Sequence, residues 1–182
     1  MSPMETLESD ASRAVGRICI RPAGHADIPA LLPLVRGLTD AEQQLNTWAL
    51  TNALAGAEWR GQLGTDFGCL VADERGVSVG LASYYIMPGP PPTLYANGVF
   101  VLPDRRRRDV GRGLMRALAR EAQARGCAAM VWHIVASDAV SREFSVRMGA
   151  RPGPDGASYQ FSRDAISRFS SVAPDNDASA PG

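Results

Sequence analysis

The sequence predicts an α/β (α+β) fold in which about four helices pack on a mixed, mostly antiparallel sheet of six to seven strands. The chain has 182 residues, enough for one domain with a real core. Its composition, 45% hydrophobic and 21% charged, is that of an ordinary globular protein. Strand and helix patterns alternate along it without an internal repeat, which is typical of this class. We expect flexible tails at 1–15 and 171–182 around a domain at 16–170.

The first elements are predicted by their hydrophobic periodicity. Apolar and polar residues alternate over 16–22, which indicates a strand. A helix is predicted over 27–38, with Pro29 in its first turn, where the missing N–H costs nothing. Thr39 and Glu42 have the spacing of a capping box, so a second helix should begin there.

A hairpin and an alternation of strands and helices make up the rest of the domain. Two β-rich segments surround an Asp-Glu-Arg-Gly turn within 67–87, which is the pattern of a β-hairpin. Glycine and proline residues then mark the turns that separate the remaining elements. We expect a strand over 94–102, a helix over 113–126, a strand over 127–136, a helix over 138–149 and a final strand over 157–163.

The charged residues exclude several classes of function. The 19 basic residues are all arginine, so no lysine is present to form a Schiff base or act as a nucleophile. The formal net charge is zero, which argues against a general nucleic-acid-binding protein. No apolar run approaches the roughly 18 residues of a membrane helix. The acidic N-terminus also differs from a secretory signal.

Cysteine and histidine are too sparse to suggest a metal centre. Cys19, Cys69 and Cys127 lie far apart in apolar segments, and His25 and His133 are the only histidines. No metal site is therefore predicted. We interpret the cysteines as reduced thiols of a cytoplasmic protein.

The stretch "PDRRRRDVGRGL", residues 103 to 114, is the strongest functional signal. It lies between a predicted strand and a predicted helix. The first N–H groups of such a helix have no partner within the helix, and this end of the helix carries partial positive charge. Arginine side chains neutralise a phosphate, and glycine lets the backbone approach it closely. A solvated charge run and a nucleic-acid patch are the alternatives, and Asp104 and Asp109 argue against the latter. A P-loop is excluded because no Gly-Lys-Ser/Thr ends the turn.

The segment "VFVLPDRRRRDVGRGLMRAL" resembles the acetyl-CoA-binding motif of the GNAT superfamily of N-acyltransferases. The resemblance is strong over 94–152 and extends in outline to 17–165, most closely to the diamine acetyltransferase branch. It implies acetyl-CoA as co-substrate, with the pantetheine arm paired to the strand and the pyrophosphate held by the turn. The residues implied to contact it are Phe100, Val101, Leu102, Arg106, Arg107, Arg108, Asp109, Val110, Gly111, Arg112, Gly113 and Asp138.

Two registers fit the family pattern Gln/Arg-x-x-Gly-x-Gly/Ala. The first places Arg106, Asp109 and Gly111 at the three defined positions, so an aspartate replaces the first glycine. The second uses Arg108, Gly111 and Gly113, and it lengthens the loop by two residues. We prefer the first because the helix then keeps its apolar face.

The resemblance also locates departures in the chemistry. The family's usual general acid, a tyrosine near the end of the following helix, corresponds to Ser145, whose hydroxyl is a poor proton donor to a thiolate. The acidic pair of the diamine branch corresponds to Asn97 and Gly98, so a polyamine acceptor is not expected.

Four side chains are considered for proton transfer. Ser145 occupies the position of the family's acid. Strand alternation places His133 opposite Trp132, and His133 is the best-suited base if it faces the cleft, although a partly buried, hydrogen-bonded histidine is the favoured alternative. Tyr84 and Tyr85 are consecutive in a strand, so one should pack in the core and the other could offer a hydroxyl.

The function predicted from these observations is transfer of an acetyl group from acetyl-CoA to a primary amine of a small molecule or peptide. The competing hypothesis is a weak or inactive acyl-CoA-binding module, which Asp109 and Ser145 together motivate. We expect no nucleic-acid or membrane partner, and the protein could form a homodimer.

Overall fold

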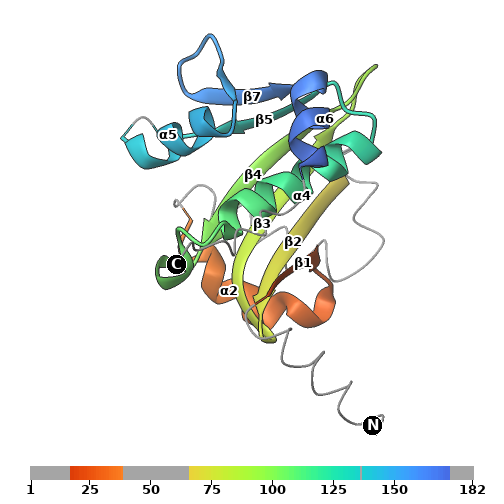
Figure 1. The fold of residues 1–182 in the computed structure, drawn as a ribbon. Coiled ribbons are helices and arrows are strands. Elements are labelled where there is room, and N and C mark those ends of the chain that lie inside the picture. The colour runs from red at the N-terminus through yellow and green to blue at the C-terminus, as the bar shows by residue number, and fades with distance from the viewer. Residues whose placement is uncertain (1–16, 39–65, 136, 173–182) are drawn as a thin grey trace, which may run out of the picture.

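The computed structural model describes residues 17–38, 66–135 and 137–172 (Figure 1). Within them, seven strands form one sheet in the order β1-β2-β3-β4-β5-β7-β6. The elements are β1 (Ile18–Pro22), η1 (His25–Asp27), α2 (Ile28–Val35), β2 (Asp66–Glu74), β3 (Val77–Met87), β4 (Thr93–Val101), η3 (Pro103–Arg105), α4 (Val110–Ala124), β5 (Ala129–His133), α5 (Ala139–Arg147), β6 (Arg151–Pro152), β7 (Ser158–Ser162) and α6 (Arg163–Ser171).

The predicted fold class is confirmed. Among the described strands, β4 and β5 pair in parallel and every other neighbouring pair is antiparallel. The hairpin is also confirmed, because β2 and β3 are joined by Arg75 and Gly76, both at positive φ. Two consecutive left-handed residues make the tight turn that suits the twist of paired strands.

The two faces of the sheet bury separate apolar clusters. Alternate residues of β2 and β3, such as Ala72 and Ala82, pack in a large cluster under α4 and α6. Their sequence neighbours Val71 and Leu81 face the other way and pack against α2. Figure 1 shows α4 crossing the sheet with α6 beside it. The N-terminal end of α4 therefore reaches the far end of β4, where the two strands β4 and β5 part.

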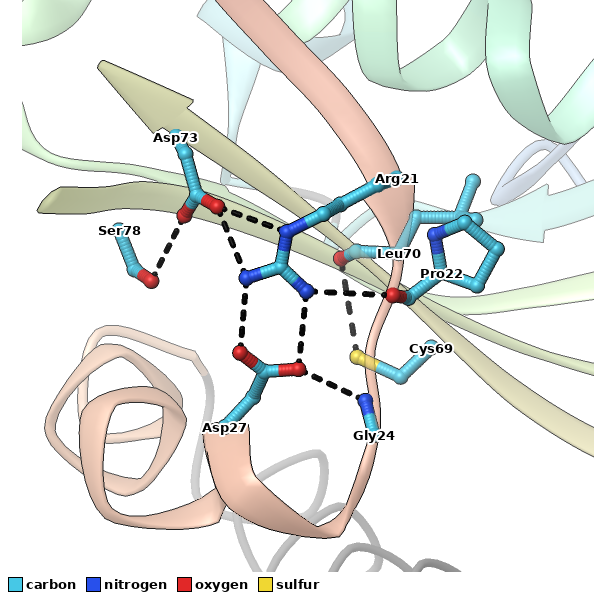
Figure 2. A network of polar contacts seen from close by, with 8 residues as sticks. All are labelled: Arg21, Pro22, Gly24, Asp27, Cys69, Leu70, Asp73 and Ser78. Atoms are coloured by element: carbon cyan, nitrogen blue, oxygen red, sulfur yellow. Dashed lines mark hydrogen bonds and ion pairs between the residues drawn. The ribbon is translucent and has the colours of Figure 1, made fainter. Parts of the chain in front are cut away.

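A polar network fastens η1 and α2 to the first two strands (Figure 2). The guanidinium of Arg21 on β1 donates two hydrogen bonds to the carboxylate of Asp27, at 2.8 and 3.0 Å, and one to Asp73 on β2 at 2.9 Å. Asp27 also accepts a hydrogen bond from the N–H of Gly24. Arg21 lowers the pKa of Asp27 from 3.8 to about 2. The network holds α2 against the face that includes Phe100.

Some element boundaries differ from those predicted. Helix α4 begins at Val110 rather than at Gly113, because the chain already enters the helix after a left-handed Asp109. Helix α6 was not predicted at all. The predicted helix from Thr39, the tail over 1–15 and residues 173–182 lie outside the described residues.

Candidate active site

Strands β4 and β5 separate after a short parallel ladder. The ladder pairs Thr93–Ala96 with Ala129–Trp132, and β5 ends at His133 while β4 continues to Val101. In the part of the chain that the structure describes, residues 97–101 of β4 thus have no partner strand on the β5 side and face β3 alone. We call this stretch the β4 edge.

A β-bulge explains the separation. Ser83 of β3 pairs with Gly98, but the next residue, Tyr84, pairs with Ala96, so Asn97 has no opposite residue. An extra residue in one strand bends that strand and increases its local twist. The bulge lies directly after the last rung of the β4–β5 ladder, so it turns the β4 edge away from β5.

Two main-chain N–H groups of the β4 edge face the opening. Leu102 donates its N–H to the carbonyl of Val79 at 2.9 Å, so its main-chain groups point toward β3. Because these directions alternate along a strand, Phe100 also points to β3, whereas Val99 and Val101 point outward. Of the three residues predicted to pair with pantetheine, only Val101 therefore offers its main chain to the opening. Its carbonyl already accepts a hydrogen bond from Arg106 Nε at 3.0 Å.

The segment from Pro103 to Asp109, which we call the arginine turn, leads from the β4 edge into α4. Arg107 and Asp109 both have positive φ, 62° and 57°, and Val110 then begins the helix. A left-handed residue followed by a helical one makes consecutive N–H groups converge into an anion-binding concavity. The positive end of the α4 dipole adds to it. Asp109 thus has the conformation that normally selects glycine, in agreement with the first register of the family motif.

The four arginines of the turn have different partners. Arg105 is held by the carboxylate of Glu74, whose hydrogen bond raises the pKa of this guanidinium, and by Asp104. Arg106 lies 5.7 Å from the centre of the Phe100 ring. Arg108 approaches Glu74 only to 3.7 Å, and its side chain is 60% exposed. Arg107 is exposed as well. Arg107 and Arg108 can therefore turn toward an anion at the N-terminus of α4.

The N-terminus of α5 lies next to the arginine turn. Asp138 caps it, accepting hydrogen bonds from Ser141 N at 2.9 Å and Ser141 Oγ at 2.5 Å. These bonds lower the pKa of Asp138, and the positive charges of Arg142 and Arg106 contribute in the same direction. The predicted cofactor residue Asp138 is thus a helix cap within the electrostatic reach of Arg106.

This arrangement of a splayed strand pair, a left-handed turn and a helix N-terminus coincides with a family match. The model of the Acetyltransferase (GNAT) family matches residues 36–150, well over half of the chain. The chain belongs to the GNAT family. It is therefore an enzyme of the acyltransferase class. No curated protein matches the chain in sequence.

The GNAT fold is also evident from solved structures. A GNAT-family protein from Desulfovibrio desulfuricans has a TM-score of 0.68 at 17% identity, covering 81% of this chain and 99% of that one. The yncA protein of Salmonella typhimurium, solved with acetyl-CoA, has a TM-score of 0.60 at 26% identity, covering 81% and 94%. An aminoglycoside 6'-N-acetyltransferase from Acinetobacter haemolyticus has a TM-score of 0.60 at 19% identity, covering 73% and 90%.

The position of Ser145 does not support the acid role predicted for it. Its side chain is 1% exposed, and its hydroxyl accepts a hydrogen bond from Trp132 Nε1 at 3.0 Å. The single hydroxyl proton is donated to the carbonyl of Ser141 at 2.9 Å. Ser145 therefore joins α5 to β5 and has no proton left to give to a thiolate.

Tyr84 is likewise a core residue, whereas Tyr85 lies on the opposite face. Tyr84 is 6% exposed within the cluster under α4, and burial, with Glu121 next in effect, raises its pKa. Its ring fits against Gly68, where an added Cβ would lie 2.3 Å from the ring. The predicted catalytic role of Tyr84 is not supported. Tyr85 instead stacks on Tyr95 with ring centres 4.8 Å apart.

His133 has two polar contacts and lies on the Tyr85 face, opposite Trp132. Its Nδ1 is 2.7 Å from the hydroxyl of Tyr95, and its Nε2 is 3.4 Å from a carboxylate oxygen of Asp155. Its side chain is 50% exposed, so the predicted alternation is confirmed but the expected partial burial is not. Sequence reasoning named neither Tyr95 nor Asp155, which are distant from each other in the chain.

Arg112 and Gly113, the last two residues of the predicted motif, face away from the opening beside the β4 edge. An added Cβ at Gly113 would lie 2.8 Å from the Ile20 side chain of β1, so this glycine allows α4 to pack closely. Arg112 lies over the Phe169 ring of α6 at 5.9 Å. A Cβ at Gly111 would instead point between Phe144 of α5 and Val101, touching neither closer than 3.7 Å. Gly111 faces the opening; Arg112 and Gly113 do not.

The described residues offer neither a metal centre nor a membrane-spanning helix. They hold no group of three His, Cys, Asp or Glu side chains placed to bind a metal ion. Of the helices that the structure describes, none is long and apolar enough to cross a membrane.

Proposed function

We propose that this GNAT enzyme transfers the acetyl group of acetyl-CoA to a primary amine by direct attack. One observation carries the proposal: the open β4 edge leads directly into a left-handed turn at the N-terminus of α4. The β4 edge can form hydrogen bonds with an extended, amide-containing arm, and the turn at the N-terminus of α4 can hold phosphates. Coenzyme A joins these two chemical features in one molecule. The yncA structure with acetyl-CoA supports this choice of co-substrate.

The residues present suit coenzyme A. The N–H groups of Val99 and Val101 can pair with the pantetheine arm, and the N–H groups at Asp109 to Gly111 can bind the pyrophosphate. Arg107 and Arg108 can neutralise it. Gly111 is a helical glycine with room for a side chain, so its own packing does not require glycine. It leaves space between α5 and the β4 edge, where the arm would pass.

Acetyl-CoA supplies the activated acyl group, and the chain supplies orientation and polarisation. An outward N–H of the β4 edge, at Val101 or Val99, is suited to donate a hydrogen bond to the thioester carbonyl. Holding the amine and the thioester together lowers the entropic part of the barrier. Neither contribution requires Ser145 or Tyr84.

The acceptor that fits best is a primary amine of a small molecule or peptide. Asn97 and Gly98 provide no negative charge at the bulge. The aminoglycoside 6'-N-acetyltransferase among the similar structures supports an amine acceptor. A polyamine would lack carboxylate partners on this part of β4. We further infer a cytoplasmic enzyme, which the buried free thiols of Cys69 and Cys127 support.

Ligand-induced stabilisation and thiol release test the function together. Acetyl-CoA at about a hundredfold excess over its dissociation constant should stabilise the protein by roughly 2.7 kcal/mol. Free thiol should then appear with at least one amine in a panel of small and peptide amines. Stabilisation without thiol release would favour the non-catalytic binding module, and no stabilisation would refute both functions.

A charge-matched pair of variants localises the binding. Arg107→Gln combined with Arg108→Gln should weaken coenzyme A binding, and the loss should be larger at low salt because charged contacts are screened. Arg147→Gln combined with Arg168→Gln is the control, since it removes the same charge at two exposed arginines, one on α5 and one on α6. Equal affinities for the two variants would contradict the role of the arginine turn.

A further inference from the structure

We propose that Tyr95, His133 and Asp155 form a proton relay in which the Tyr95 hydroxyl exchanges a proton with the acceptor amine. The inference rests on the proposed acetyl transfer and assigns its proton-transfer step. Tyr95 is the catalytic residue, His133 is the base behind it, and Asp155 is a positioning residue.

The relay lies where the two strands part. Tyr95 belongs to the rung before the last of the parallel ladder, and His133 is the first residue of β5 beyond the last rung. Their hydrogen bond therefore spans the point at which the β4 edge begins. The bulged residue Asn97 follows at once, and the outward N–H of Val99 comes two residues later.

Among the residues that the structure describes, the Tyr95 side is the more open of the two faces at this point. On the other face, Ala96 and Trp132 are 5% and 7% exposed, and Trp132 is bonded to Ser145. Ser145, at the position that corresponds to the family's usual tyrosine, is part of this packing. On the Tyr95 side, His133 is half exposed. A proton donor and acceptor on this face can therefore reach a reacting nitrogen at the fork.

Asp155 is held in place by the β6–β7 turn. Its Oδ1 accepts hydrogen bonds from the N–H of Ala157 and from the N–H and hydroxyl of Ser158, at 3.1, 2.8 and 2.6 Å. These donors, Ser158 foremost, hold the pKa of Asp155 well below its usual range. The carboxylate is thus anionic and fixed, and its other oxygen faces His133 Nε2.

This contact favours one tautomer of the imidazole. A carboxylate beside Nε2 favours a proton on that nitrogen, which leaves Nδ1 as an acceptor. The Tyr95 hydroxyl then donates to Nδ1 across 2.7 Å. Since both ring nitrogens are engaged, His133 acts on the substrate through the phenol rather than directly.

The proton movements balance within the transfer. The neutral amine attacks the thioester carbonyl carbon, forming the C–N bond and placing the electron pair on oxygen. As this intermediate collapses, the C–S bond breaks and the thiolate leaves with its electron pair. A nitrogen proton passes to Tyr95 Oη while the phenol proton passes to His133 Nδ1, next to the anionic Asp155. His133 then releases a proton to solvent, and the thiolate takes one from solvent.

Substitutions of matched tyrosines test the catalytic role. Tyr95→Phe should lower kcat by roughly 10²-fold, at the low end of general acid–base contributions, with an unchanged dissociation constant for coenzyme A. Tyr85→Phe is the control: it removes a hydroxyl from the stacked neighbour and should change kcat by less than about twofold. Equal rates for wild type and Tyr95→Phe would overturn the proposal.

A double variant tests whether the residues act as one unit. Tyr95→Phe combined with His133→Gln should be no slower than the slower single variant, because groups that act in series are not additive. Multiplicative losses would overturn the relay. Asp155→Asn should lower kcat while leaving the affinity for coenzyme A unchanged.

A spectroscopic measurement tests the relay without catalysis. Long-range proton–nitrogen NMR correlations report which imidazole nitrogen carries the proton, and His25 is the only other histidine to assign. At mildly alkaline pH, His133 should show its proton on Nε2, and Asp155→Asn should shift the balance toward Nδ1. A proton on Nδ1 in the wild type would overturn the relay. Absence of thiol release from the wild type would instead refute the proposed function.

Discussion

Replacing Asp109 with glycine isolates the residue that departs most from the family's phosphate-binding pattern. Asp109 has a φ of 57°, and its side chain caps no N–H of α4. A left-handed L-residue costs roughly 1–2 kcal/mol, and aspartate lies at the low end of that range. A glycine loses about 0.5–1 kcal/mol through the entropy of the unfolded chain. The two nearly cancel, so Asp109→Gly should leave the unfolding free energy almost unchanged.

Binding should change more than stability. The carboxylate lies at the helix end where the pyrophosphate is proposed to bind, and Coulomb's law gives about 1 kcal/mol for two unit charges about 4 Å apart in water. We expect Asp109→Gly to tighten coenzyme A binding about tenfold, which corresponds to about 1.4 kcal/mol.

The assay is isothermal titration calorimetry of coenzyme A at low and high salt. Asp109→Asn is the matched control, because it removes the charge, keeps the side-chain size and tolerates positive φ. It should retain most of the gain, and the gain should shrink at high salt. Weaker binding in both variants would refute the reasoning and would show that the carboxylate contributes to the site.

Three further changes test other parts of the structure. Gly111→Ala should stabilise α4 by about 0.5–1 kcal/mol and preserve coenzyme A affinity, whereas Gly111→Val should weaken the affinity by filling the opening; equal affinities by calorimetry would contradict this. Ser145→Ala should cost about 1–3 kcal/mol in urea unfolding by leaving the Trp132 N–H unpaired, with kcat unchanged; a fall in kcat at unchanged stability would restore its catalytic role. Asp27→Asn should cost about 1 kcal/mol near neutral pH, discounted for the 41% exposed Arg21. Because the folded pKa of Asp27 is lowered to about 2, this cost should disappear as pH falls from about 3.8 toward 2; a constant cost would refute it.

Local patterns predicted most of the fold. The hairpin follows from Arg75 and Gly76, and the strand preceding the arginine turn follows from its composition. Helix α6 was missed because it begins at Arg163, directly after the last strand ends at Ser162, with no connecting turn. A signal was present: Ser162 caps the helix by accepting a hydrogen bond from Ala165 N. Ile166 and Phe169 then have helical spacing.

The site was predicted only where its residues are contiguous. The arginine turn and Gly111 follow each other in the chain, so a motif could identify them. The bulge at Asn97 depends on pairing with β3, which no local pattern encodes. Tyr95, His133 and Asp155 come from three separate segments, so only the folded sheet brings them together. The burial of Ser145 likewise depends on Trp132 of another strand.

The central claim is that coenzyme A binds along the β4 edge and at the N-terminus of α4. Titration of the isotope-labelled protein with coenzyme A, followed through backbone amide chemical shifts, tests it most directly. The largest changes should occur at Val99, Val101 and the amides from Asp109 to Gly111, with much smaller changes at Gly113, whose Cα faces β1. Largest changes elsewhere in the sheet, or none at saturating coenzyme A, would contradict the account.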